Sequence, residues 1–380
     1  MTKPAVVHAC DYGAPYLGNF MASQLALAEG TREYLQLDSH FALPSRARGR
    51  PWIGEVESRG FSYTFLDEGE GRLRRGRRLA ELVAQRRSIF HSHFYAFDLD
   101  TVIAAQSSGS RVVWHIQSGL ANYPLRRRLS DLIKVRMIGR RRCDLLVACS
   151  DAAGEDSIRR GFGRDQVKVV PNAIALDRFP ADSRQRELVR DELGVAHDAT
   201  MFLSFCWDPE RKGTDLAVEG MRRLREQGRA EGAVMVLVGQ ERLRVFVDRL
   251  HPEGLPSWLT IADPIEDVAG LYRAADAFVS AARSEGLPYA IGEAMASGLP
   301  VISSDIPWAS HYFPADGVTT FPSEDVGALE AALSAALDPA RREHWGAANR
   351  RFALSELGID RYVERLLGEY DRLLDGPAGG

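Results

Sequence analysis

The sequence predicts a protein of two α/β domains, each built around a doubly wound parallel sheet. Its 380 residues exceed the ~100 to 200 residues of an ordinary domain, so two cores are expected. In both halves short apolar runs alternate with longer amphipathic stretches, which is the rhythm of strands and helices in a parallel sheet. Between the halves, Pro171 and Asn172 open a stretch of turn-forming residues that predicts a linker at about 172–185.

The first half is expected to form the first sheet. Apolar and β-branched residues predict strands at 5–10, 61–66, 88–94, 111–116, 144–149 and 167–170. Helical periodicity predicts helices from about Met21 to Glu29 and from about Leu79 to Gln85.

The second half repeats this architecture. Strands are predicted at 201–207, 233–239, 259–263, 277–282 and 300–304. A helix is predicted from Asp215 to Gln227, and the chain is helical in pattern throughout from about Pro339, with a frayed tail after Gly376. We therefore expect domains at 1–175 and 176–360, followed by a C-terminal helix and tail at 361–380 that returns toward the first domain.

The composition is that of a globular protein outside the membrane. Hydrophobic residues make up 45% and charged residues 26% of the chain, and no apolar run reaches the ~18 to 20 residues that span a bilayer. The start, MTKPAVVHAC, lacks the pattern of a secretory signal. Cys10, Cys143, Cys149 and Cys206 show no metal-ligand or CxxC spacing, so a reducing, cytoplasmic compartment is expected.

Charge is divided unevenly along the chain. The first half has a net positive charge and the second half a net negative one. Two arginine clusters stand out in the first half, Arg72 to Arg78 before a predicted helix and the stretch at 124–142, which includes Arg126, Arg127 and Arg128. Either this basic excess faces an anionic surface, such as the inner face of a membrane, or it is the solvated side of core-packed helices.

The most informative stretch is SEGLPYAIGEAMASGLPVISSD, at 284–305. Glu285 closes a predicted strand, Gly286, Leu287 and Pro288 form a tight loop, and Glu293 stands near the start of a helix. Ligands bind beyond the carboxyl ends of strands in such sheets, and a helix N-terminus presents N–H groups and a positive dipole end to an anionic group. The alternative is that Glu285 caps the loop and Glu293 only decorates the first helical turn.

This stretch resembles the family 4 retaining glycosyltransferases, whose signature is a glutamate pair with seven residues between, in a phrase like EGFGLPxxEAMAxGxPVVxxD. LYRAADAFVSAARSEG before it and VVPNAIALDRF are similar to the family's helix, strand and linker. The resemblance is strong over about 145–340 and weaker in the first half. It implies the GT-B fold, two Rossmann-like domains facing a cleft, with acceptor in the first domain and nucleotide sugar in the second. It also implies that Glu285 contacts the transferred sugar and Glu293 the ribose.

Lys212 opens a predicted helix within FCWDPERKGTDLAVEGM. A lysine in this position can neutralise a pyrophosphate leaving group. The family resemblance implies a clamp of this lysine with an arginine five residues earlier, but Trp207 stands there. Either Arg211 supplies the missing charge or the clamp is single. The alternative for Lys212 is a solvated lysine at a helix start.

In the first half the resemblance points to fewer residues. Gly18 lies where the family has a glycine-rich loop near the donor phosphates, although such a glycine is commonly only part of a turn. Gln117 takes the place of the family's histidine at a strand end, and His115 precedes it on the same face. Both are candidates for contact with the sugar or phosphate, with a core histidine as the alternative. His91 and His93 are similar to a family strand whose histidines are mostly structural.

One further feature argues against a metal site, and another leaves the identity of the sugar open. Asp98 and Asp100 spell the Asp-x-Asp of metal-dependent transferases, but they open a predicted helix where Asp98 is a plausible N-cap. His311, near Trp308, replaces a glutamate of the family, which removes a guide to the sugar.

The sequence therefore predicts a metal-independent, cofactor-free hexosyltransferase that uses a nucleoside-diphosphate sugar, most readily a UDP-sugar, and an acceptor hydroxyl on a glycan, glycolipid or natural product. Nucleic acid is not an expected partner. The alternatives are a sugar-nucleotide epimerase or hydrolase on the same fold, or a non-catalytic subunit that binds sugar nucleotides.

Overall fold

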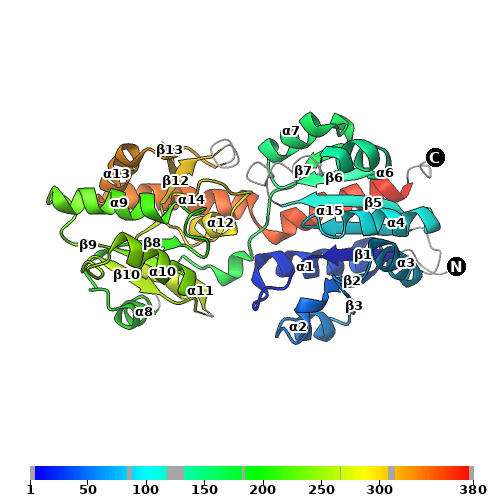
Figure 1. Cartoon of the computed structure of the whole chain (residues 1–380), viewed down its shortest axis with the longest axis horizontal. Coiled ribbons are helices and arrows are strands. Elements are labelled where there is room, and N and C mark those ends of the chain that lie inside the picture. The colour runs from blue at the N-terminus through cyan, green and yellow to red at the C-terminus, as the bar shows by residue number, and fades with distance from the viewer. Residues whose placement is uncertain are drawn as a thin grey trace. The chain divides into compact units, whose positions relative to one another are not determined.

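The computed structural model describes residues 5–83, 88–117, 132–181, 185–265, 267–306 and 313–375. It divides into two compact units (Figure 1). Unit 1 comprises Met1–Ala173 together with Ile359–Gly380, and unit 2 comprises Ile174–Gly358. Each unit has its own parallel sheet with helices on both faces, so the predicted fold class is confirmed.

Unit 1 contains a seven-stranded sheet in the order β3-β2-β1-β4-β5-β6-β7. Its strands are β1 (Ala5–Cys10), β2 (Asp38–Pro44), β3 (Ser62–Leu66), β4 (Ile89–His93), β5 (Arg111–Ile116), β6 (Leu145–Ala148) and β7 (Val167–Val169). Its helices are α1 (Gly18–Tyr34), α2 (Ile53–Ser58), α3 (Arg72–Leu82), α4 (Asp98–Ser108), α6 (Arg140–Arg142), α7 (Asp151–Arg160) and α15 (Ile359–Asp375). A short π-helical turn at Val135–Gly139 precedes α6.

Unit 2 contains a six-stranded sheet in the order β10-β9-β8-β11-β12-β13. Its strands are β8 (Thr200–Phe205), β9 (Ala233–Val238), β10 (Leu259–Ala262), β11 (Ala277–Ser280), β12 (Val301–Asp305) and β13 (Val318–Pro322). Its helices are α8 (Arg186–Leu193), α9 (Thr214–Glu226), α10 (Glu241–Leu250), α11 (Val268–Ala274), α12 (Tyr289–Ala296), α13 (Val326–Ala335) and α14 (Pro339–Glu356).

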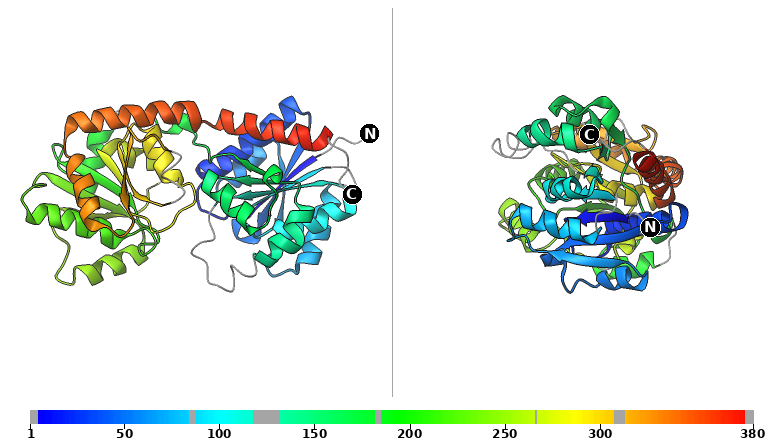
Figure 2. Two further views of the ribbon diagram at one scale, coloured as in Figure 1. Left: turned by 90° about the horizontal axis from the view of Figure 1, so that it is seen from above. Right: turned by 90° about the vertical axis from the view of Figure 1, so that its right-hand side faces the viewer.

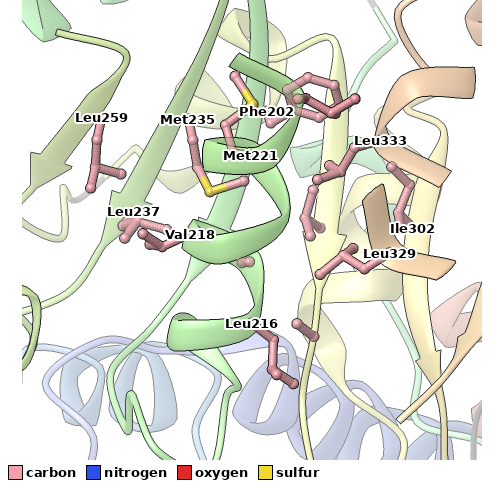
Figure 3. Close-up of a cluster of buried hydrophobic side chains, with 14 of the residues drawn as sticks. Phe202, Leu216, Val218, Met221, Met235, Leu237, Leu259, Ile302, Leu329 and Leu333 are labelled. Atoms are coloured by element: carbon pink, nitrogen blue, oxygen red, sulfur yellow. The ribbon is translucent and has the colours of Figure 1, made fainter. Parts of the chain in front are cut away.

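The core of unit 2 explains why its strands are almost wholly apolar. On one face of the sheet, Phe202, Met235 and Ile302 pack against α9 and α13 (Figure 3). On the other face a second cluster, with Leu203 and Val301, packs against α11, α12 and α14. A strand buried on both faces needs apolar side chains at consecutive positions, which produces runs such as MFLSF and AVMVLV.

Two strands lie where the sequence analysis expects none. β2 has the sequence DSHFALP and contains no β-branched residue, so strand propensity does not mark it. β13, VTTFP, lies at the edge of its sheet with Thr320 exposed. Edge strands tolerate such polar residues and a proline, because only one side of the strand must pair.

One expectation about the helices is wrong. The arginines from Arg72 to Arg78 lie on α3 itself rather than before a helix. Arg75 is buried there, with its Nε 2.7 Å from Asp100 Oδ1. The C-terminal stretch is helical as expected, in two helices, α14 and α15, that are separated at Leu357 and Gly358. The amide of Ile174 donates to the carbonyl of Leu357 at 2.7 Å, which ties this break to the start of unit 2.

α15 completes the core of unit 1, although it follows all of unit 2 in the sequence. Leu366, Tyr362 and Tyr370 are buried among side chains of the central strands. The Nε2 amide of Gln24 on α1 donates to Tyr362 at 2.9 Å, and Tyr370 Oη lies 2.6 Å from Nδ1 of His91. Figure 2 shows α15, in red, beside the strands of this unit. Within the described ranges no helix is both long and apolar enough to cross a bilayer.

Because α15 packs against the central strands of unit 1, a substitution that weakens this packing should destabilise strands that lie far from α15 in the sequence. Leu366 is fully buried, and replacing such a leucine by alanine costs about 2 to 5 kcal/mol. We expect Leu366→Ala to weaken hydrogen-exchange protection of β1 and β4 and to leave β8 and β11 unchanged.

Leu354→Ala is the matched control, because Leu354 on α14 is 54% exposed and exposed sites change stability by less than about 0.5 kcal/mol. If Leu366→Ala reduced the protection of β8 as much as that of β1, the assignment of α15 to unit 1 would be contradicted.

Candidate functional site

Lys212 and Glu285 meet at the ends of two neighbouring strands of unit 2. β8 and β11 are paired in the sheet, so the loops that follow them emerge side by side. Lys212 Nζ lies 2.5 Å from Glu285 Oε1, and the Lys212 and Glu285 side chains are only 9% and 11% exposed. Both residues are predicted from motifs some seventy positions apart in the sequence, and the fold brings them into contact.

Arg211 binds the same carboxylate. Its Nη1 lies 2.8 Å from Glu285 Oε1 and 2.9 Å from the carbonyl oxygen of Ser284. Its Nε also lies 3.1 Å from Asp208 Oδ2. Two cationic side chains therefore converge on one glutamate oxygen, at a place where a helix begins.

The close approach of the two loops requires Gly213. This residue has a φ of 63°, and a Cβ there would overlap the carbonyl oxygen of Ala281. The amide of Arg283 donates to the carbonyl of Arg211 at 2.8 Å. The Lys212-Gly213 pair is therefore fixed by backbone packing, and the lysine is held immediately before Gly213, the N-cap residue of α9.

Trp207 lies beside the two cations. Its indole is 62% exposed, with the guanidinium carbon of Arg211 4.4 Å and Lys212 Nζ 5.5 Å from its ring centroid. These distances suit cation–π attraction. In the place of the family's arginine the chain thus has an aromatic surface, and the second cation comes from Arg211.

Glu293 lies on α12, beyond the loop of Gly286, Leu287 and Pro288. Pro288 occupies the N-cap position, and no side chain caps the helix. Glu293 Oε2 accepts a hydrogen bond of 2.8 Å from the hydroxyl of Tyr272. Burial, reinforced by the glutamate, raises the pKa of Tyr272 well above its ordinary value, so this phenol stays a donor.

Sequence reasoning missed Tyr272 as a functional-site residue. It lies on α11, and its ring is buried against Phe205 and Phe278. An aromatic residue on an amphipathic helix is ordinarily core, and only the fold shows that its hydroxyl fixes Glu293.

The candidates of unit 1 are placed as follows. Gly18 begins α1 with a φ of 59°, and a Cβ there would come within 2.8 Å of the Tyr12 hydroxyl, so backbone geometry alone requires glycine. His115 and Gln117 are 2% and 7% exposed. His115 stacks on Tyr362 of α15, and Gln117 Nε2 lies 3.4 Å from Nδ1 of His93. Trp308 and His311 lie outside the described residues.

Asp98 and Asp100 are both engaged by protein groups. Asp98 is the first residue of α4 rather than its N-cap, which is Phe97. Its carboxylate accepts from Ser92 at 2.6 Å and from Lys134 at 2.9 Å, and Asp100 pairs with Arg75. The expected N-cap role of Asp98 is therefore wrong, because long-range partners take its oxygens.

Comparison with known proteins gives two family matches in succession. The model described as Glycosyltransferase Family 4 matches residues 38–178, and the model described as Glycosyl transferases group 1 matches residues 199–338. Together they cover more than two thirds of the chain. The second match contains Lys212, Glu285 and Glu293.

Individual curated relatives are 25% to 30% identical to parts of this chain. A D-inositol 3-phosphate glycosyltransferase of Xylanimonas cellulosilytica is 30% identical over 43% of this chain and 41% of its own length. A UDP-Gal:alpha-D-GlcNAc-diphosphoundecaprenol alpha-1,3-galactosyltransferase of Escherichia coli is 25% identical over 59% of each. The chain thus spans about two fifths to three fifths of the length of these curated relatives.

Among solved structures, Anabaena HepE in complex with UDP has the same fold, with a TM-score of 0.80 at 15% identity over 97% of this chain and 100% of the other. The two successive family matches, the glutamate pair with its lysine and the two parallel sheets agree, and the chain belongs to the family 4 glycosyltransferases of the GT-B fold.

Proposed function

We propose that this chain is a retaining hexosyltransferase that moves a sugar from a UDP-sugar to an acceptor hydroxyl on a glycan, glycolipid or natural product. The observation that carries this proposal is the convergence of Lys212 and Arg211 on Glu285 beside a helix N-terminus. The names of two similar proteins support the donor class, since one binds UDP and another uses UDP-Gal.

Donor binding would exchange partners within this cluster. Without ligand, the two cations neutralise Glu285. A diphosphate carries more negative charge than one carboxylate, so it competes for Lys212 and Arg211 and frees the Glu285 oxygens to accept from sugar hydroxyls. The start of α12, which follows Glu285 closely in the chain and has no side-chain cap, would add a positive dipole end. Glu293, held by Tyr272, accepts from the ribose.

Transfer then depends on stabilising the leaving group. As the bond between the anomeric carbon and the phosphate oxygen breaks, charge grows on the diphosphate, where the two cations and the helix end act most strongly. The acceptor oxygen attacks on the same face of the sugar, and its proton passes to the departing phosphate oxygen. These groups supply the neutralisation that a metal ion provides elsewhere, so we propose that this step needs no metal.

The proposed function is tested by incubating the protein with a panel of nucleotide sugars and acceptors. Thermal shift identifies the donor, because a ligand that binds the folded state raises the melting temperature. A product with the donor's anomeric configuration, accompanied by free UDP, is expected. An altered free sugar nucleotide without acceptor product would indicate an epimerase or hydrolase, and binding without any turnover would indicate a non-catalytic subunit.

Lys212→Ala is expected to lower kcat strongly, with a smaller loss of stability because Arg211 still neutralises the buried Glu285. Loss of one charge-stabilising donor costs about 3 kcal/mol of transition-state free energy, or roughly a hundredfold in rate. The measurement is the rate of UDP release at saturating donor. Arg244→Ala is the control, because Arg244 also pairs with a carboxylate in unit 2, that of Asp263. Near-normal turnover by the Lys212 variant would contradict its role.

Glu285 and Glu293 are expected to differ in their kinetic effects. Glu293→Gln should raise KM for the donor and leave kcat nearly unchanged, because ribose is remote from the reacting carbon, whereas Glu285→Gln should lower kcat as well. Tyr272→Phe keeps Glu293 but removes its 2.8 Å hydrogen bond, so it should share the KM defect in weaker form. Identical defects in the two glutamate variants would disprove this division of roles.

For the acceptor, we propose a lipid-linked or phosphate-bearing molecule presented at the cytoplasmic face of a membrane. The basic excess of the first half supports this, as do the names of a lipopolysaccharide glucosyltransferase and a diphosphoundecaprenol galactosyltransferase among similar proteins. Glu70 already neutralises Arg74 and Arg78 on α3, and Asp100 neutralises Arg75. Arg72 and Arg77 of α3 are exposed, and we assign the larger part of the attraction to Arg126, Arg127 and Arg128, which lie outside the described residues.

Co-sedimentation with vesicles tests this assignment. We expect binding to anionic vesicles at low salt and release at high salt, since each basic residue near such a surface contributes about 1 kcal/mol. Changing the three arginines at 126–128 to Ser should abolish binding. Changing Arg222, Arg223 and Arg225 to Ser is the control, because Glu219 pairs with two of these arginines. No binding at low salt would point to a free small-molecule acceptor.

A further inference from the structure

Four histidines form a layer inside unit 1, on the sheet face that α15 covers. His8 lies on β1, His91 and His93 on β4, and His115 on β5. The strand register pairs His8 with His91 and His93 with His115. Because residues two apart on a strand point to the same face, all four side chains share one face, and none is more than 2% exposed.

Most ring nitrogens of this layer lack a partner. Both nitrogens of His8 and of His115, and Nε2 of His91 and His93, are buried without a hydrogen bond to any described residue. Each buried polar atom left unsatisfied costs about 1 to 3 kcal/mol. A fold keeps such groups when something else satisfies them. The proposed chemistry at Lys212 and Glu285 uses none of these histidines.

The spacing of the nitrogens fits a metal ion. His8, His91 and His93 each offer a nitrogen, and these atoms lie within 4.8 Å of one another. Zinc with Zn–N bonds of about 2.0 to 2.1 Å holds tetrahedral nitrogen ligands ~3.4 Å apart, so modest ring rotations close the set. His115 lies beside it, with its ring centroid 5.2 Å from that of His93 and 5.4 Å from that of His91.

The partners of the other ring nitrogens favour metal binding through Nε2. Tyr370 Oη lies 2.6 Å from Nδ1 of His91 and can accept its proton, which leaves the Nε2 lone pair for a metal. The Gln117 amide lies 3.4 Å from Nδ1 of His93. Since its Oε1 has no described partner and amide orientation is an assignment, a flipped amide accepts from that Nδ1 in the same way. Hydrogen bonds of this kind orient the histidine ligands of metals.

We propose that His8, His91 and His93 bind a zinc ion, with His115 as the fourth ligand, and that this ion is structural. A set of neutral imidazoles suits zinc and other late transition metals and not magnesium or calcium, which prefer oxygen. The ion would join three central strands and, through Tyr370, the C-terminal helix. The proposed chemistry at Lys212 and Glu285 uses none of these ligands, so the zinc proposal is tested independently of the proposed function.

The test uses the full chain without a polyhistidine tag, stripped of metal by a chelator. Competition with a chromophoric chelator measures zinc affinity, and elemental analysis after gel filtration measures stoichiometry. We expect one zinc per chain and a higher melting temperature with zinc than without it. Cobalt should give the intense visible absorption of a tetrahedral site. Substoichiometric zinc with no change in melting temperature would overturn the proposal using the wild type alone.

Variants locate the site. His93→Phe should abolish stoichiometric binding, and Tyr370→Phe, which keeps every ligand, should weaken binding about 10- to 100-fold. His40→Gln is the control, because His40 pairs in register with Val7 and so lies on the opposite face of the sheet. Unchanged zinc affinity in both His93→Phe and Tyr370→Phe would place the metal elsewhere and refute the assignment.

Discussion

The bond between Lys212 and Glu285 is the interaction on which the candidate site depends. It joins the loops after β8 and β11, and it forms only because Gly213 lets one loop lie against the carbonyl of Ala281. A buried ion pair is weak evidence for stability, since both charges must lose water. Together with the Arg211–Glu285 pair, it places two cations on one carboxylate beside a helix start.

Lys212, Arg211 and Glu285 could be selected from the sequence because they lie in two local motifs, and the structure brings them into contact; their role in binding a donor stays a prediction. The fold class was equally predictable, since strands buried on both faces need continuous apolar runs. What escaped prediction depends on contacts between distant segments. Tyr272 reaches Glu293 from another helix, and Asp98 is taken by Lys134 and Ser92 rather than by its own helix. β2 escaped because its residues have low strand propensity and only its neighbours stabilise it.

The histidine layer shows the same limit. The alternation of side chains along the strand SIFHSHF predicts from sequence alone that His91 and His93 share one face. Whether that face meets solvent depends on α15, whose residues lie more than 260 positions later and cover the layer with Tyr362 and Tyr370. Burial lowers the pKa of His8 and of His115 to about 3, so the rings are neutral at physiological pH. The C-terminal helix therefore decides the chemical state of residues at the start of the chain.

The contacts of Arg211 explain how the site keeps a second positive charge although Trp207 replaces the family's arginine. Arg211 contacts Asp208, the Ser284 carbonyl and Glu285 at once, so its guanidinium is held in place before any ligand arrives. A cation placed this way needs no second arginine on the preceding loop, and the indole beside it leaves its charge available while shielding one face from water. A fixed, partly desolvated cation interacts more strongly with a growing charge than a flexible, hydrated one. Arg211, held by these three contacts, therefore supplies a second fixed positive charge beside Lys212, at the end of unit 2 where Trp207 replaces the arginine.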